Sequence, residues 1–262
     1  MTEKYTSTLR DARVLVLGGT SGIGYAVAEH TLALGAHVFV SSSRESSVSR
    51  TISRLLAFDP QATTRVHGSV CDLQDISKLR SNLETLLKAV TQDGQLDHIV
   101  FTAGDALPIS PINETSPEEL QKLGNVRFYA PMILSGLVPQ YMKISHHSSL
   151  TLTTGTAIHR PLKGYTALIA YGAGVEGLMR GLAVDLAPIR VNVVSPGAVR
   201  TERFDSFGEE RLQTTLDMFQ KWSLTNTVAT PEEASEAYVY LMKSSFSTGT
   251  LVTIDGGRLI KQ

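Results

Sequence analysis

Short runs of β-branched and apolar residues recur along the chain between longer segments in which apolar positions repeat at helical spacing. The runs are RVLVLG (13–18), HVFVSS (37–42), TTRVHGS (63–69), DHIVFTAG (97–104), SLTLTTG (149–155), RVNVVSPG (190–197) and GTLVTIDGG (249–257). The helical segments lie near residues 22–34, 45–57, 74–91, 116–141, 164–187 and 231–243, with a shorter one around 208–221. This alternation predicts an α/β fold with a doubly wound, mostly parallel seven-stranded sheet and helices on both faces.

The pattern shows no internal repeat, low-complexity tract or linker along its 262 residues. We therefore expect one domain over 1–262, with a nucleotide-binding half at about 12–105. Residues 200–230 have the weakest periodicity and follow a strand end, where folds of this kind bind ligands. They are interpreted as a substrate-covering segment, or as a plain surface excursion.

The amino-acid composition indicates which kinds of binding partner the protein has. Lys plus Arg number 24 against 25 Asp plus Glu, which argues against a nucleic-acid or anionic-membrane binder and favours a small-molecule ligand. The single cysteine, Cys71, excludes an intrachain disulfide and fits a core position near a strand end, and the Cys and His spacing indicates no metal site. The first dozen residues are polar and no apolar run approaches ~20 residues, so we expect a soluble, cytosolic protein.

A glycine turn joins the first strand to the first helix. In LVLGGTSGIG, Gly18, Gly22 and Gly24 let backbone amides approach a pyrophosphate at a helix N-terminus. Thr20, Ser21 and Ile23 complete this predicted cofactor turn.

The second strand ends in SSSRESS, without the acidic residue that would bind a ribose 2′-hydroxyl. Ser42, Ser43 and Arg44 suit a 2′-phosphate instead, because a guanidinium matches phosphate geometry. We therefore predict NADP(H) rather than NAD(H), the alternative being that Arg44 is a solvated charge at a helix start.

Several motifs occur in order along the chain: GGTSGIG, CDL after the third strand, TAG after the fourth, EGLMRGLAVDLAPIRVNVVSPGAV and the closing IDGG. With these motifs the chain resembles the short-chain dehydrogenase/reductases over nearly its whole length. The resemblance implies a Rossmann-type fold with further cofactor contacts. Asp72 and Leu73 would flank the adenine, Ala103 and Gly104 would border the cofactor, and Val199 and Thr201 would hold the nicotinamide amide, with Gly197 as another contact.

The usual catalytic residues of this family, Asn, Ser, Tyr and Lys, are absent. Counting back from VEGLMRGLAVDLAPIRVN puts Gly172 in the Lys place, Leu168 in the Tyr place and Gly155 in the Ser place. Tyr171 lies roughly 100° around the helix from Gly172, off the face that positions 168 and 172 share.

Five polar residues are candidates for the emptied site. Arg127 falls in the Asn place, with Asn125 as the alternative, and Arg127 would support the nicotinamide ribose or a substrate carbonyl, or else be a salt-bridge partner. Thr154 and Thr156 flank Gly155, one of them expected to face the core because strand neighbours alternate. Tyr165 and His159 would lie near the substrate or in a surface loop.

Loss of a positioned acid costs on the order of 10² to 10⁴ in rate for a step that needs a proton, so ketone reduction should be poor. Hydride transfer to an iminium, or to an enone that later takes its proton from water, needs mainly positioning and a suitable field. Leu168 and Gly172 should leave a larger, more apolar pocket, and we expect a bulky, polycyclic substrate.

The same departures are similar to a group of fungal natural-product reductases that includes iminium reductase/Diels–Alderases. Leu162 and Lys163 stand where those enzymes carry an acidic residue, so their pericyclic activity is not carried over. We expect an NADPH-dependent reductase of activated C=N or C=C bonds in secondary metabolism. Alternatives are a non-redox isomerase or cyclase using NADP(H) as a pocket wall, and a non-catalytic NADP(H)-binding subunit.

The helices at 116–141 and 164–187 commonly form dimer or tetramer interfaces in the family. Small residues at Gly172, Gly174, Gly177 and Gly181 permit close approach of a second chain or tight packing on the sheet. A homodimer or homotetramer is expected.

Overall fold

The computed structural model describes residues 9–105, 111–202, 204 and 207–262. It contains one seven-stranded sheet in the order β3-β2-β1-β4-β5-β6-β7, and every adjacent pair of strands is parallel. The strands are β1 (Arg13–Leu17), β2 (His37–Ser42), β3 (Val66–Val70), β4 (His98–Phe101), β5 (Ser149–Thr153), β6 (Arg190–Pro196) and β7 (Leu251–Ile254). The predicted doubly wound α/β fold is confirmed, and its strand order reverses between β1 and β4, where such folds open a crevice.

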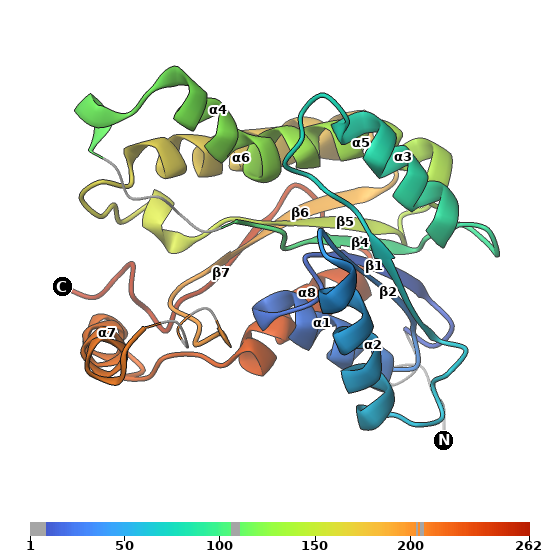
Figure 1. Ribbon diagram of the computed structural model, residues 1–262, viewed down its shortest axis with the longest axis horizontal. Helices are drawn as coiled ribbons and strands as arrows, with labels where there is room; N and C mark the ends of the chain where they lie inside the picture. The colour runs from blue at the N-terminus through green and yellow to red at the C-terminus, as the bar shows by residue number, and fades with distance from the viewer. Residues whose placement is uncertain (1–8, 106–110, 203, 205–206) are drawn as a thin grey trace.

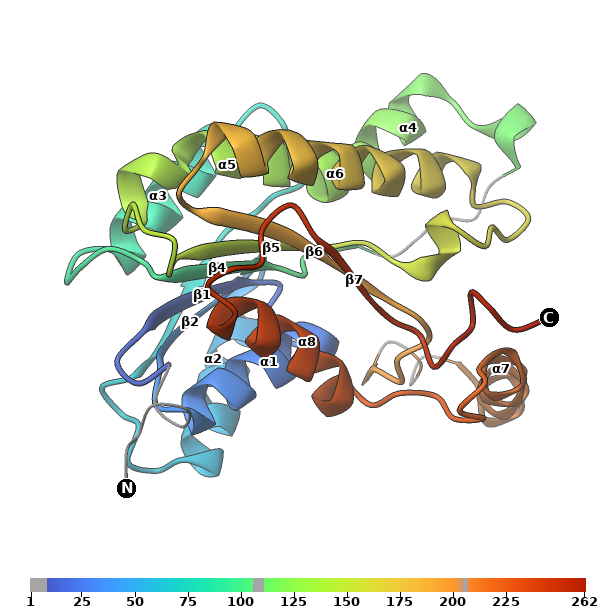
Figure 2. The ribbon, with the colours of Figure 1, turned by 180° about the vertical axis from the view of Figure 1, so that it is seen from behind.

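Helices cover both faces of the sheet, as Figure 1 and Figure 2 show. One layer holds α1 (Gly22–Ala33), α2 (Glu45–Phe58) and α8 (Pro231–Lys243). The other holds α3 (Leu79–Val90), α4 (Pro117–Gly124), α5 (Ala130–Tyr141) and α6 (Thr166–Asp185). Apart from these layers, α7 (Glu209–Trp222) lies beside the C-terminus (Figure 2), where Lys261 Nζ donates to the carbonyl of Ser223 at 2.9 Å.

Strand alternation divides the core between the two layers. In β1, Val14 and Val16 belong to the cluster beneath α1 and α8, whereas Leu15 and Leu17 belong to the cluster beneath α3, α5 and α6. Successive side chains on a strand point to opposite faces, so an unbroken apolar run fills both cores.

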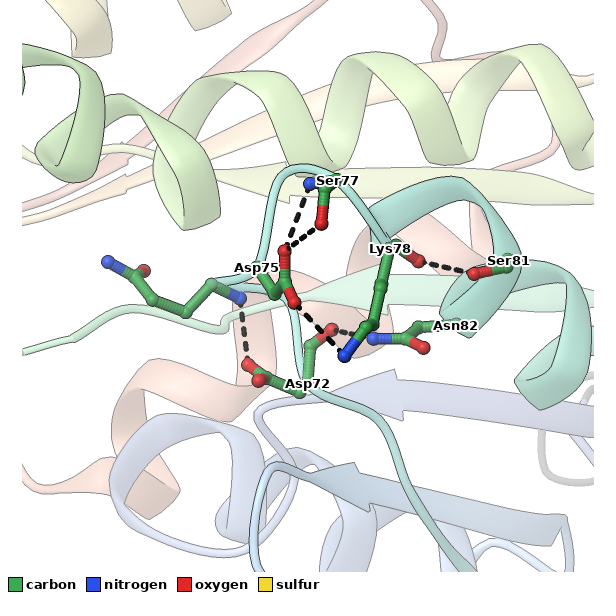
Figure 3. Close-up of polar contacts among 7 residues, drawn as sticks. Asp72, Asp75, Ser77, Lys78, Ser81 and Asn82 are labelled. Carbon is green, nitrogen blue, oxygen red and sulfur yellow. Dashed lines mark hydrogen bonds and ion pairs between the residues drawn. The ribbon is translucent and has the colours of Figure 1, made fainter.

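The helix expected from residue 74 begins only at Leu79. Figure 3 shows the cause: Asp75 Oδ1 accepts bonds from the Ser77 amide at 3.0 Å and from its hydroxyl at 2.6 Å. In the same segment, Asp72 Oδ1 accepts the Gln74 amide at 2.8 Å. Asn82 Nδ2 also donates to the Asp72 carbonyl at 2.9 Å. Side chains that bond backbone amides two residues ahead favour turns over helix, which the hydrophobic spacing alone did not reveal.

The helix expected at 116–141 contains an interruption. A capping box begins α4, with the Ser116 hydroxyl accepting the Glu119 amide, and a π-helical turn, η3 (Asn125–Tyr129), separates α4 from α5. A π turn inserts one extra residue into the helical repeat and is frequent at functional sites. Here it carries both Asn125 and Arg127.

By length and composition α6 could cross a membrane, a property the apolar runs did not indicate. Its most apolar window has a mean hydropathy of 1.2 and is 17% buried. Three of its residues, Val175, Glu176 and Met179, are buried, and Val175 and Met179 belong to the core above the sheet. One helix of this kind is weak evidence for a membrane span, and most of its window is not buried within the chain.

Candidate active site

Two adjoining cavities open at the carboxyl ends of the strands. The larger, of about 840 Å³, contains Gly18, Thr20, Ser21, Gly22, Ile23, Gly24, Ser42, Ser43, Arg44, Asp72, Leu73, Ala103, Gly104 and Thr201 among its lining residues. The smaller, of about 380 Å³, is lined by Arg127, Gly197 and Val199 and shares Ile23, Ala103, Thr153 and Thr201 with the larger one. The structure thus brings all the predicted cofactor residues to this pair of cavities, which we call the cofactor cavity and the substrate cavity.

The turn before α1 has the geometry of an anion cradle. Gly18 has a φ of +82°, and a Cβ at this position would lie 2.6 Å from the Ala103 nitrogen. The Gly22 amide donates to Glu202 Oε2 at 2.7 Å, so a carboxylate from the 200–230 segment already occupies the N-terminus of α1. Helix N-termini attract anions through their free amides and dipole, and the turn therefore fits a dinucleotide pyrophosphate.

The end of β2 presents a cation to the cofactor cavity. Arg44 is exposed and occupies the N-cap position of α2 without a capping hydrogen bond from its side chain. The adjacent acidic residue, Glu45, accepts the Ser49 hydroxyl at 3.2 Å and is not among the residues that line the cavity. Ser43 and Arg44 thus have the chemistry that a 2′-phosphate requires.

The three altered catalytic places all line the substrate cavity. Gly155, Leu168 and Gly172 come together there, so the counted register agrees with the geometry. The prediction that the cavity is enlarged at Gly172 is wrong, because a Cβ on Gly172 would lie 2.6 Å from Ile158 Cδ1. Ile158 fills the space, and the wall is apolar rather than empty.

Tyr171 contributes to the cavity wall but has its hydroxyl engaged elsewhere. The helical spacing predicted that Tyr171 lies off the face shared by Leu168 and Gly172, yet Tyr171 lines the cavity. Its hydroxyl donates to the Leu120 carbonyl at 3.0 Å, and its ring lies 5.6 Å from that of Phe128. Burial, and after it the neighbouring Tyr129, raises the pKa of the Tyr171 hydroxyl. A hydroxyl with a raised pKa is a poor substitute for the missing acid.

The π turn separates the roles of Arg127 and Asn125. Asn125 Nδ2 donates to the Gln74 carbonyl at 2.8 Å and does not line the substrate cavity, whereas Arg127 does. The Arg127 guanidinium packs against Gly104, where a Cβ would lie 3.0 Å from Nη1. Its Nε lies 3.2 Å from Asp105 Oδ1 and its Nη2 donates to the Asp105 carbonyl at 2.5 Å, so Arg127 is both a cavity residue and an ion-pair partner.

The other polar candidates differ in placement. Thr154, Thr156 and Tyr165 line the substrate cavity, and Thr156 is almost fully buried. Thr154 Oγ1 is buried and makes no hydrogen bond within the described residues. The position suggested for His159 beside the substrate is wrong, because His159 is absent from the lining and its Nε2 lies 3.0 Å from Glu176 Oε1.

Four residues important to these cavities were not singled out from the sequence: Asp105, Ile158, Glu202 and Arg258. Asp105 directly follows TAG and Arg258 directly follows IDGG. A charged residue next to each motif was therefore the sequence feature that could have identified these two as cavity residues. The 200–230 segment contributes Phe204 and Phe219 as well as Thr201 to the substrate cavity. Within the described ranges, no group of three His, Cys, Asp or Glu side chains could hold a metal ion.

The chain is similar along its whole length to proteins of a known family. A model described as an SDR-like Rossmann domain matches residues 5–261. Short-chain dehydrogenase/reductase malC of Malbranchea aurantiaca is 40% identical, with 99% of each chain covered, and short-chain dehydrogenase/reductase fsr5 of Gibberella fujikuroi is 38% identical, with 98% of each covered. The solved structure of the MalC reductase/Diels–Alderase superposes with a TM-score of 0.92 over 98% of this chain and 99% of that one.

These similarities extend over the full fold and include relatives named as reductases. They agree with the glycine turn, with the two cavities at the switch point and with a fold that binds a nicotinamide cofactor. The chain belongs to the short-chain dehydrogenase/reductase family and is an oxidoreductase of that family.

Proposed function

We propose that this protein is an NADPH-dependent reductase that acts on an activated C=C or C=N bond, an enone or an iminium, of a bulky polycyclic substrate in secondary metabolism. The observation that carries the proposal is the wall of the substrate cavity. It is fully formed, yet Leu168, Gly172 and Ile158 occupy the space where the family keeps its Tyr and Lys. Such a site suits substrates that need no proton at the moment of reduction.

The two cavities together have groups suited to each part of NADPH. The amides of the Gly18–Gly22 turn would bind the pyrophosphate, and Ser43 with Arg44 would bind the 2′-phosphate. Asp72 and Leu73 would flank the adenine, while Val199 and Thr201 would contact the nicotinamide. When bound, NADPH supplies a hydride.

Charge in the substrate cavity favours enones over iminium ions. Its lining includes the guanidinium groups of Arg127 and Arg258 and no Asp or Glu among the described residues. On an enone, a new C–H bond forms at the β-carbon, the C=C electron pair moves toward the carbonyl oxygen, and water protonates the α-carbon. Guanidinium groups stabilise the negative charge that develops on that oxygen, whereas they would repel a substrate that enters as a cation.

Arg127 is the residue we assign to this stabilisation, with Asp105 holding its guanidinium against Gly104. Arg127→Gln should lower kcat/KM for an enone by roughly 10² and leave NADPH affinity nearly unchanged. Arg50→Gln, an exposed cation on α2, is the matched control and should have no effect.

The decisive experiment titrates NADPH and NADH into the protein, then follows the reduced-nicotinamide absorbance after adding cyclic enones, cyclic iminium salts and simple ketones. We expect tighter binding of NADPH, oxidation with enones, slower oxidation with iminium salts and almost none with ketones. Rapid ketone reduction would contradict the proposal, as would binding without oxidation by any substrate.

A cyclase activity is the second candidate, because the 40% identical relative of solved structure is named a reductase/Diels–Alderase. In this chain Leu162, which lines the substrate cavity, and the exposed Lys163 offer no carboxylate at the loop before α6. Product formation in the presence of NADP⁺, without any absorbance change, would favour that activity over reduction. A stable partner complex with cofactor binding and no turnover would instead indicate a non-catalytic subunit.

We further infer that the protein works in the cytosol as a homodimer or homotetramer and that residues 200–230 cover the substrate. The balanced charge and the apolar outer face of α6 support the first inference, and the cavity contacts of Phe204 and Phe219 support the second.

A further inference from the structure

A buried guanidinium just after β7 adds to the positive charge of the substrate cavity but is assigned no contact of its own in the reduction described above. Arg258 is only 8% exposed, and it lines both the substrate cavity and a neighbouring cavity of about 230 Å³ beside α7. No ion pair joins it to a carboxylate in the described part of the chain. The nearby Asp255 carboxylate instead accepts the amides of Gly257 and Leu259, each at 2.9 Å.

The bonds that Arg258 does make are few and long. Its Nη1 lies 3.4 Å from Thr156 Oγ1, its Nη2 donates to the Arg160 carbonyl at 3.3 Å, and its Nε has no hydrogen-bond partner within the described residues. The guanidinium also lies 4.8 Å from the centre of the Trp222 ring. Five N–H donors are therefore only partly satisfied in a place from which water is largely excluded.

A desolvated cation with spare donors is costly unless a ligand supplies the acceptors. Burial, with Arg160 adding to it, lowers the pKa of Arg258, but an arginine remains protonated at neutral pH. The other cation in the lining, Arg127, is paired with Asp105. Of the two guanidinium groups in this lining, Arg258 is the one without a carboxylate partner among the described residues.

We propose that Arg258, with the Thr156 hydroxyl beside it, is a binding site for a carboxylate group of the substrate. A guanidinium fork matches two carboxylate oxygens, and the apolar side chains of Ile158, Phe204 and Phe219 in the same cavity would contact the carbon skeleton. The substrate class is thus a polycyclic acid. The inference depends on the proposed function only in treating this cavity as the substrate site.

A structural tether is the alternative role for Arg258. Arg160 Nη1 donates to the carbonyls of Arg258 and Lys261 at 2.6 and 3.1 Å, so the loop after η4 (Thr156–Ile158) and the C-terminal segment are already joined by another side chain. A tether contributes to stability but gives no preference for a charged ligand over a neutral one. Ligand charge selectivity therefore separates the two roles.

Trp222 is the single tryptophan of the chain and lies against Arg258, which makes its emission a reporter of this site. We would saturate the protein with NADP⁺ and titrate adamantane-1-carboxylate and adamantane-1-carboxamide, two bulky ligands of similar shape that do not absorb in the tryptophan region. The carboxylate should bind about tenfold tighter or more, since a hydrogen bond to a charged group contributes about 1.5–3 kcal/mol. A ratio near one in the wild-type protein overturns the proposal.

Three variants locate the preference. Arg258→Met should bring the affinity ratio to about one while changing carboxamide affinity less than about threefold, and Arg258→Lys should retain part of the ratio. Arg160→Met, which removes the neighbouring cation, should leave the ratio intact. Loss of the preference in Arg160→Met, or its persistence in Arg258→Met, would assign the site to another residue and overturn the proposal.

If Arg258→Met fails to fold, the wild-type ratio and the Lys variant still decide the question. Equal weakening of both ligands in Arg258→Met would identify a site for a neutral carbonyl and would also overturn the carboxylate assignment. Because binding is read with NADP⁺, carboxylate binding without any later reduction of enones would refute the proposed function and leave this inference standing.

Discussion

At the scale of single residues, the contact between Gly172 and Ile158 explains why the family's acid pair is not easily restored. A Cβ on Gly172 would lie 2.6 Å from Ile158 Cδ1, so even alanine overpacks this position. Gly172→Ala should therefore destabilise the protein by about 1–3 kcal/mol, although Gly→Ala inside a helix normally stabilises by up to about 1 kcal/mol. Urea denaturation would measure the change.

Gly177→Ala is the matched control on the same helix, because nothing lies within 4 Å of a Cβ there. It should be neutral or stabilising, and Ile158→Ala should relieve most of the penalty of Gly172→Ala in a double-mutant cycle. Equal effects of alanine at both glycines would contradict this account. Restoring ketone reduction with Leu168→Tyr and Gly172→Lys should consequently require a smaller residue at 158.

Glu202 competes with the cofactor for the amide at the start of α1. Its Oε2 accepts the Gly22 amide at 2.7 Å, and this carboxylate must leave before a phosphate oxygen can bind there. Glu202→Gln should lower the Kd for NADPH by roughly 3- to 10-fold, because the charge that favours a helix N-terminus is then absent from the competitor. Nicotinamide fluorescence would measure it, with the exposed Glu236→Gln as control. Unchanged affinity in Glu202→Gln would show that this contact does not oppose binding.

The site residues that could be predicted from the sequence are those in local motifs. The Gly18–Gly24 turn has its strand, turn and helix within one short segment, so the required backbone approach can be inferred from spacing. Arg258 and Thr156 are 102 residues apart, and Arg127 and Asp105 are 22 apart. Such pairs depend on how elements pack, which periodicity does not specify.

At the scale of elements, hydrophobic spacing correctly predicted the strands and most helix bounds, including 231–243. It did not reveal the π turn at Asn125–Tyr129, because an extra residue in one helical turn barely alters the apolar pattern over 116–141. That extra residue decides whether Asn125 or Arg127 faces the substrate cavity. Alignment with the family placed Arg127 at the Asn position, and the hydrophobic pattern alone could not have made that choice.

The central strand pair β4 and β5 carries a titratable group in the core. His98 pairs with Ser149 across the sheet, its Nδ1 lies 2.9 Å from the Ser149 hydroxyl, and burial lowers the pKa of His98 from 6.5 to about 3. The folded protein therefore keeps this ring neutral, while the unfolded chain binds a proton below about pH 6.5. Stability should fall as pH drops from about 6.5 toward 3, by up to about 1.4 kcal/mol per pH unit from this group alone.

Urea denaturation at pH 7, 6, 5 and 4 measures that slope. His98→Gln, which stays uncharged and can still bond Ser149, should lose less stability per pH unit below pH 6 than the wild type does. Carboxylates contribute equally to both proteins, so identical slopes would show that His98 titrates normally in the folded state.

At the scale of the whole molecule, the two layers leave a face of α6 uncovered by the described part of the chain. Along α6, Ala173, Gly177 and Gly181 follow one another at intervals of four residues and are exposed. Gly177 and Gly181 have no atom within 4 Å of a Cβ position, whereas Gly172 and Gly174 face Ile158 and Phe128. The glycines of α6 thus divide into a set that packs within the chain and a set that is open.

A helix face that is open and lined with small residues permits a second helix to approach closely. Val184, near the end of α6, is 77% exposed and extends this face along the helix, with the exposed Arg180 beside it. We expect a second copy of the chain to cover this face, with α6 of one protomer against α6 of its partner. Gly177→Arg should then convert the assembly to monomers, because the long charged side chain holds the helices apart.

Light scattering coupled to size exclusion would measure the mass of Gly177→Arg beside Gly177→Ala and Gly208→Arg. Gly177→Ala keeps a small side chain at the interface and should remain oligomeric, and Gly208→Arg adds the same charge at an exposed glycine outside α6. Arginine favours helix more than glycine does, so loss of assembly in Gly177→Arg cannot come from a weakened helix. If Gly177→Arg retains the wild-type mass, α6 is not the interface. If it becomes monomeric but still binds NADPH, the cofactor cavity is complete within a single protomer.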